Sequence, residues 1–85
     1  MNSVIAVFGS RSETLTFSNA LRRMGVANQI VSTPRQAGRT CGISVKFGYE
    51  YFQYGKIVLN QGRFVSFHGF FIEQQVGGRE VITKG

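Results

Sequence analysis

The chain has 85 residues, of which 42% are hydrophobic, and it carries a formal net charge of +6 at pH 7. This length predicts a single domain over residues 1–85 with a small core, and the composition excludes a disordered chain. The apolar run Val4–Phe8 is too short for a signal peptide or a membrane span, and the one cysteine, Cys41, cannot form an internal disulfide. We therefore expect a cytoplasmic protein with a free thiol and no membrane partner.

The positive charge is concentrated in the first half of the chain. Residues 1–47 contain six of the ten Lys and Arg residues but only one of the four acidic residues. Such an excess suits an anionic ligand, an acidic protein partner or nucleic acid. Charge alone does not choose among the three.

A strand and a helix are expected first. Ser3–Phe8 is short and rich in β-branched residues, and Gly9 follows it, which predicts a buried strand. Ser10 and Glu13 have the spacing of a capping box, which predicts the start of a helix, and Gly25 suits its C-terminal end. Between them, apolar residues recur at helical spacing and predict one stripe facing a sheet: Phe17, Ala20, Leu21 and Met24.

The central segment reads as a loop between two strands. Val26–Ser32 predicts the second strand, and Pro34 ends it because proline has no N–H to donate to a ladder. Thr33–Gly42 is rich in Thr, Arg and Gly and predicts a loop, whereas Ile43–Phe47 predicts the third strand. Loops on a rigid scaffold often carry function, so we expect any chemistry of this protein in this loop.

Tyr49–Asn60 is ambiguous because it is rich in aromatic residues and contains a glycine. The pattern fits a distorted helix or an irregular segment. We favour the helix because Tyr51, Tyr54 and Val58 would share a face and because Gly62 could end it.

The remaining pattern predicts a hairpin and completes the order of elements. Phe64–Val76 resembles a strand, Gly77-Gly78 is a two-residue turn signal, and Arg79–Thr83 would return as a short last strand. The order β-α-β-β-α-β predicts an α/β (α+β) two-layer sandwich of ferredoxin-like type with a C-terminal β-hairpin extension. In a right-handed β-α-β unit the first two strands run parallel, so the Gly9–Ser12 turn and the Thr33–Gly42 loop should be neighbours.

This arrangement makes Cys41 a candidate reactive thiol. A thiol reacts as its thiolate, and a helix N-terminus or nearby cations lower its pKa from about 8.5 towards 7 or below. Gly42 leaves room beside it for the sulfur of a partner. The residues expected to bind the anionic sulfur lie in the helix-starting turn and in the loop: Ser10, Arg11, Ser12, Arg35 and Arg39. The alternative is that Cys41 is a small structural residue at the start of a strand.

The motif Thr33-Pro34-Arg35, followed by Cys41-Gly42 and a strand that ends at Phe47, resembles the selenium/sulfur carrier-like family of small bacterial proteins, a domain of unknown function. The resemblance covers residues 3–47, and the rest of the chain follows it only in outline. Members of the family have a more acidic and regular second helix where this chain has Tyr49–Tyr54.

The resemblance implies a carrier cysteine at Cys41. A donor enzyme of the cysteine-desulfurase type would pass sulfur or selenium to it, and an acceptor protein would collect the atom from a persulfide-type adduct. Arg35 and Arg39 would hold the anionic sulfur, helped by the turn at Arg11. On this reading the protein is a carrier rather than an enzyme and needs no cofactor.

No other motif suggests catalysis. His68, the one histidine, lies in a predicted strand beside Gly69, and we interpret it as a sheet residue rather than a base. One Cys and one His do not make a zinc site, which needs three or four ligands. The glycine-rich motifs that bind nucleotide phosphates are missing from the sequence.

Nine of the eleven aromatic residues fall between Phe47 and Phe71, which raises two alternative functions. One is RNA binding through sheet aromatics that stack on bases. However, Phe64-Val65-Ser66-Phe67 matches only the last half of the RNP1 pattern and lies in the fourth predicted strand instead of the third, so nucleic acid is not the expected partner. We expect instead that the aromatics fill a small core or cover a dimer face. The other alternative function is an interaction module with a structural Cys41, which would form a homodimer through a sheet edge or an aromatic patch.

Overall fold

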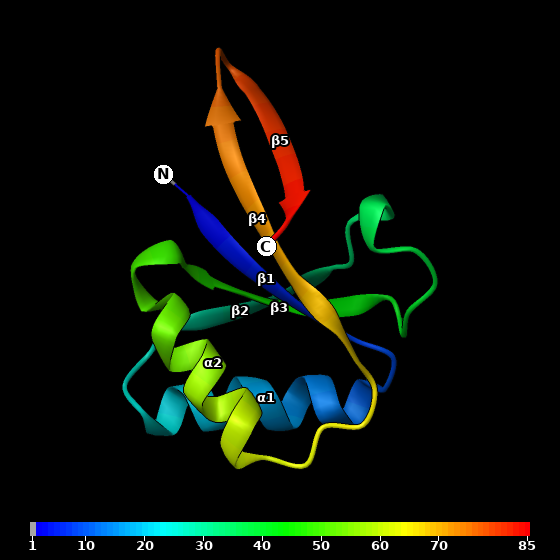
Figure 1. The fold of residues 1–85 in the computed structure, drawn as a ribbon, viewed down its shortest axis with the longest axis vertical. Helices are drawn as coiled ribbons and strands as arrows, with labels where there is room; N and C mark the ends of the chain where they lie inside the picture. The colour runs from blue at the N-terminus through cyan, green and yellow to red at the C-terminus, as the bar shows by residue number, and fades with distance from the viewer. Residues whose placement is uncertain (1) are drawn as a thin grey trace.

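The computed structural model describes residues 2–85, which form a five-stranded antiparallel sheet and two α-helices (Figure 1). The strands stand in the order β2-β3-β1-β4-β5, so the first strand lies at the centre. The fold is α+β, as the order of predicted elements indicated. Neither helix in the described residues is long and apolar enough to cross a membrane. The strands are β1 (Ser3–Phe8), β2 (Asn28–Ser32), β3 (Ile43–Gly48), β4 (Phe67–Val76) and β5 (Arg79–Lys84), the helices are α1 (Arg11–Arg23) and α2 (Phe52–Gln61), and the short 3₁₀ turns are η1 (Arg35–Ala37) and η2 (Tyr49–Tyr51).

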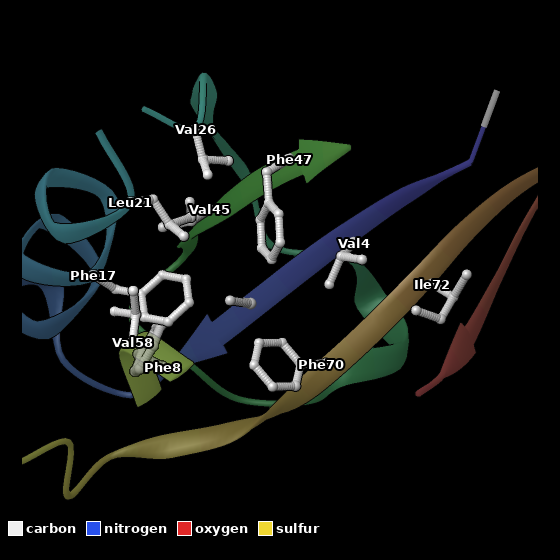
Figure 2. Close-up of a cluster of buried hydrophobic side chains, with 11 residues drawn as sticks. Val4, Phe8, Phe17, Leu21, Val26, Val45, Phe47, Val58, Phe70 and Ile72 are labelled. Atoms are coloured by element: carbon white, nitrogen blue, oxygen red, sulfur yellow. The ribbon is translucent and has the colours of Figure 1, made fainter. Parts of the chain in front are cut away.

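The central strand β1 is buried on both faces. Val4, Ala6 and Phe8 face the two helices and belong to the main core (Figure 2). Ile5 and Val7 face the opposite side of the sheet, where a second, smaller apolar cluster covers them. All five residues are at most 2% exposed. A strand covered on both faces has a continuous apolar run in place of an alternating one, as this sequence does.

Helix α1 begins where the sequence predicts. Ser10 is its N-cap, and the Ser10 Oγ accepts a hydrogen bond from the Glu13 backbone N–H at 3.3 Å. The capping box is incomplete, because the Glu13 carboxylate accepts hydrogen bonds from Val65 and Ser66. The helix ends in a Schellman cap at Gly25, whose φ of +82° suits a residue without a side chain.

The buried face of α1 differs from the predicted stripe. Phe17 and Leu21 are buried as expected. Met24 is 37% exposed, because it is the C-cap residue and lies beyond the last helical turn. Thr14 and Ser18 complete the buried face, and both hydroxyls have hydrogen-bond partners, which offsets the cost of burying them.

Strand β2 starts at Asn28, two residues later than predicted. The Val26 N–H donates to the Leu21 carbonyl in the helix cap and therefore cannot join a ladder. Val26 is nevertheless buried in the main core. Strand β3 matches the prediction and extends one residue further, to Gly48.

Helix α2 confirms the helix favoured for the aromatic segment, and it ends at the predicted glycine. Of the three residues predicted to share a face, Tyr54 and Val58 lie one turn apart on the same side of α2, but Tyr51 precedes the helix in η2, and only Val58 is buried, together with Gly55. The reason lies at Gly55, where a Cβ would stand 2.6 Å from Cζ of Phe47. The helix turns its smallest residue towards the sheet and so approaches the Phe47 ring closely.

Strand β4 starts at Phe67, three residues later than the predicted start at Phe64. The backbone N–H groups of Val65 and Ser66 donate to the Glu13 carboxylate, so these residues cannot form ladder hydrogen bonds through them. Because of this contact with α1, β4 begins only at Phe67.

The C-terminal hairpin is the one predicted. Gly77 and Gly78 have φ values of +56° and +78°, and positive φ at both positions is what a two-residue turn matched to strand twist requires. Strand β5 ends at Lys84, one residue beyond the prediction. Past Glu73 the two strands pair only with each other, and the hairpin projects from the sheet (Figure 1).

Strands β1 and β2 end at the same edge of the sheet. Both are antiparallel to β3, which lies between them, so they run parallel to each other. The turn that follows β1 and the Thr33–Gly42 loop that follows β2 are therefore neighbours, as predicted.

Candidate functional site

The Thr33–Gly42 loop is held at its base and at its tip. At the base, the Thr33 N–H donates to the Gly42 carbonyl at 3.1 Å, and the hydroxyl oxygens of Thr33 and Ser44 are 2.7 Å apart. At the tip, Ala37 packs against the second apolar cluster, on the sheet face opposite the helices: Ile5, Val7 and Phe71. The loop is thus anchored over this face, and Cys41 stands where the chain returns to the sheet.

The sulfur of Cys41 lies against the first turn of α1. Its Sγ is 3.5 Å from Oγ1 of Thr14 and 3.4 Å from the carbonyl oxygen of Ile43. The Thr14 hydroxyl also donates to the Ser10 carbonyl at 3.0 Å. Thr14 is fully buried and Cys41 is half-buried, so the sulfur rests on a buried hydroxyl while part of the cysteine stays accessible.

These two contacts suit different protonation states of the sulfur. A thiol at Cys41 donates its proton to the Ile43 carbonyl. A thiolate can only accept, and the Thr14 hydroxyl, turned from the Ser10 carbonyl towards Sγ, is a donor within reach. Sequence reasoning missed Thr14, although its position seven residues before Leu21 places it on the same buried helix face.

The three predicted arginines lie in the segments of the site but do not bond to the sulfur. Arg11 is the first residue of α1, Arg35 begins η1, and Arg39 follows in the loop. All three are exposed. Among residues 2–85, none of the three guanidinium groups is a hydrogen-bond partner of Sγ.

The other predicted site residues stand at the same edge of the sheet. The Ser10 Oγ serves as the helix cap, and the Ser12 Oγ is 3.0 Å from it. Gly42 has a φ of +92°, and a Cβ built on it would meet no atom within 4 Å. Space is therefore open beside Cys41.

His68 lies on β4, on the other side of β1. The ladder between these strands shifts register after Val7, so His68 is the extra residue of a β-bulge. Its side chain is exposed, and Nε2 is 3.0 Å from the place a Cβ on Gly9 would take. Within the described residues, no group of three or more His, Cys, Asp or Glu side chains is placed to hold a metal ion.

The segment before β4 is fixed to α1 beside the site. The Glu13 carboxylate accepts hydrogen bonds from the Ser66 hydroxyl at 2.6 Å and from the Val65 and Ser66 N–H groups at 2.9 Å. These hydrogen bonds lower the pKa of Glu13 from its ordinary value, because they favour the charged form, and the bond from the Ser66 hydroxyl has the largest effect. The ionised carboxylate therefore holds this segment against the helix.

The phenylalanines that suggested base stacking are turned inward. Phe64, Phe67 and Phe70 pack in the main core between the sheet and the helices, in a chain of ring contacts with Phe8 and Phe17. On the other face of the sheet, Phe71 is only 5% exposed. These rings therefore fill the core and are not presented for stacking on bases.

Comparison with known proteins adds one finding. A family model described as "Putative Se/S carrier protein-like" matches residues 3–61, from β1 to the end of α2, and so includes Cys41 and Thr14. The match reaches beyond the resemblance over residues 3–47 and takes in the second helix, whereas β4 and β5 lie outside it. No curated protein and no solved structure matches the chain. Because the matched segment is more than half of the 85 residues, the chain belongs to the selenium/sulfur carrier-like family.

Proposed function

We propose that the protein is a sulfur or selenium carrier in which Cys41 accepts the atom and relays it as a persulfide-type adduct. The observation that supports this most is the position of the Cys41 sulfur, on a buried hydroxyl at the start of α1 and beside open space at Gly42. Family membership supports the same class of function. The order of strands and helices also supports our assignment of the fold to the ferredoxin-like type.

The proposed step is an exchange between sulfur atoms. The Cys41 thiolate attacks the outer sulfur of a persulfide on the donor protein. A sulfur–sulfur bond forms at Cys41 while the donor's own sulfur–sulfur bond breaks, and the donor cysteine leaves as a thiolate. The outer sulfur moves with its proton, so the exchange needs no external oxidant or reductant. Attack by an acceptor thiolate on the outer sulfur of Cys41 repeats the exchange and returns the Cys41 thiolate.

The surrounding residues would stabilise the anionic sulfur during this exchange. The Thr14 hydroxyl would donate to Sγ when the proton is absent. Arg35 and Arg39, together with the turn formed by Ser10, Arg11 and Ser12, would attract the incoming anion through positive charge and free N–H groups. The expected partners are a cysteine-desulfurase-type donor and an acceptor protein, and the expected compartment is the reducing cytoplasm.

Loading with a small-molecule persulfide tests the proposal. The purified protein is incubated with glutathione persulfide and analysed by intact-protein mass spectrometry, and the expected product is heavier by one sulfur atom. The Cys41→Ser variant should gain nothing, and addition of a thiol acceptor should return the loaded protein to its original mass. A folded protein that gains no sulfur would contradict the carrier function.

The arginines are tested in the same assay. Arg35→Ala and Arg39→Ala should each lower the initial loading rate by about threefold, because each removes one positive charge near the approaching anion. Arg79→Ala in β5 is the matched control, since it removes an exposed arginine outside the loop and should leave the rate unchanged. Equal effects of all three variants would leave the loop arginines without a specific role.

A further inference from the structure

A groove between α1 and α2 is not used by the carrier chemistry. The two helices contact each other, with α2 running obliquely across α1 in Figure 1, and a hollow of about 280 Å³ beside their contact opens to solvent. Its apolar lining comes from both helices and from the segment before β4: Ala20, Met24, Val58 and Phe64. Enclosed small-molecule pockets hold about 300 to 1,000 Å³, so an open hollow of this size better suits one or two side chains of a protein partner.

The apolar surface continues along α2. Tyr54, Ile57, Val58 and Gln61 follow one another at helical spacing, so they share one side of the helix. Val58 and Gln61 line the hollow. Tyr54 and Ile57 are 41% and 43% exposed, which extends the apolar strip towards the N-terminal end of α2.

The polar rim of the groove is positively charged. Arg23 lines it directly, and Arg63 follows at the end of α2. The nearest carboxylate along α1 is that of Glu13, and its oxygens are already engaged by Val65 and Ser66. Within residues 2–85 Arg23 forms no salt bridge, so the rim offers positive charge beside an apolar floor.

We propose that this groove binds an acidic amphipathic helix of a partner protein. Apolar side chains one helical turn apart would enter between α1 and α2, and acidic residues beside them would meet Arg23. A second copy of this chain is the wrong occupant, because two positively charged grooves of a +6 protein repel each other. A nucleic acid is also the wrong occupant, because the apolar floor offers its phosphates no hydrogen-bond donor or positive charge.

The groove is a surface distinct from the cysteine site. Thr16 lies in its wall, whereas Thr14, which contacts the Cys41 sulfur, is buried on another side of the helix, because residues two positions apart do not share a helix face. The proposal itself rests on shape and charge and holds whether or not Cys41 carries sulfur.

Peptide selection on the Cys41→Ser variant tests this inference without any thiol chemistry. A random peptide library is displayed on phage and selected against the immobilised variant, and the affinity of enriched peptides is measured by fluorescence anisotropy. The expected consensus places Asp or Glu next to apolar residues three or four positions apart. Backbone amide shifts in NMR spectra should then change in residues 16–24 and 54–64.

Two neighbouring arginines give a matched pair of variants. Arg23→Glu should weaken the selected peptides by about tenfold, because a favourable charge pair becomes a repulsive one. Arg22→Glu changes the charge of the same exposed helical turn but does not line the groove, and it should change the affinity by less than about threefold. If Arg23→Glu does not fold, Arg23→Gln replaces it, with a smaller loss expected.

Several results would overturn the proposal. They are a selection that enriches no peptide, a consensus that is basic or lacks apolar residues, amide shifts confined to another surface, and equal losses in the Arg22 and Arg23 variants. Self-association of the protein that blocks the peptides would assign the groove to a second copy and would equally contradict it.

Discussion

The Thr14 hydroxyl lies 3.5 Å from the Cys41 sulfur at the start of a helix, where it could donate to a thiolate. A purely structural cysteine needs no such group, since a buried thiol packs as a small hydrophobic residue. Here Oγ1 of Thr14 is shared between the Ser10 carbonyl and Sγ, which lets one hydroxyl serve two states of the sulfur. The reactivity of Cys41 should therefore depend on a residue that is itself inaccessible to reagents.

Replacement of Thr14 by Val tests this dependence. Valine keeps the shape of threonine but cannot donate to sulfur, so we expect persulfide loading of Cys41 to slow by about tenfold, the effect of about 1.4 kcal/mol lost from a hydrogen bond to a charged atom. Thr14→Ser should keep most of the rate. The control is Thr16→Val, which removes an exposed hydroxyl from the same helix. Loading of Thr14→Val at the wild-type rate would show that the hydroxyl does not assist the thiolate.

At the scale of elements, the close approach of α2 to β3 depends on a residue without a side chain. Gly55 is buried against the ring of Phe47, which is itself only 3% exposed and cannot move aside freely. Glycine inside a helix costs about 1 kcal/mol relative to alanine, so its presence here is explained by packing.

Gly55→Ala should therefore destabilise the protein despite the better helix propensity of alanine. We expect a net loss of about 1 to 3 kcal/mol in the free energy of unfolding, measured by urea denaturation, because the new methyl group must displace the Phe47 ring. Gln53→Ala, at an exposed position of the same helix, should stay within about 0.5 kcal/mol of the wild type. A Gly55→Ala protein more stable than the wild type would mean that the helix shifts without cost.

Elements defined by local patterns could be predicted from the sequence. The continuous apolar run of β1, the Ser10 cap of α1 and the Gly77-Gly78 turn depend on residues close in the chain, and the structure has all three. The late start of β4 could not be predicted, because it depends on Glu13, which is 52 residues away from Val65. The outward turn of Tyr51 and Tyr54 likewise depends on a tertiary contact, that of Gly55 with Phe47.

The site could be predicted only as far as topology fixes it. Parallel β1 and β2 bring the Cys41 loop to the start of α1, and this followed from the order of elements. The directions in which long side chains point could not be derived from the order of elements. The roles of Arg11, Arg35 and Arg39 in binding the anionic sulfur therefore remain predictions. Thr14 was missed because no sequence pattern marks a threonine on an apolar helix face as the contact of a distant cysteine. Only the folded structure shows that contact.

At the scale of the whole molecule, the Glu13 contact joins the first helix to the segment before the last hairpin. The pKa of Glu13 is lowered in the folded state from its ordinary value of 4.5, so its contribution to stability is fully present above that value and is lost as the pH falls through the lower folded-state pKa. The wild type should therefore lose stability on acidification in this window.

Glu13→Gln removes the titrating group and should flatten this part of the pH dependence. The variant should be less stable than the wild type at neutral pH, and the two should converge in acid, as followed by thermal unfolding at a series of pH values. Glu80→Gln in the exposed last strand is the control and should keep the wild-type slope. A Glu13→Gln variant with an unchanged acid slope would place the acid sensitivity elsewhere.

The most direct test of the account is the accessibility of Cys41 in the folded protein. One thiol-specific alkylating reagent is applied from about pH 5 to about pH 9, to the native protein and to the protein unfolded in denaturant. We predict that the native protein is labelled at Cys41 throughout the range in which it stays folded, and at neutral pH faster than the unfolded chain. Labelling that occurs only after unfolding would make Cys41 a core residue and would contradict the carrier function.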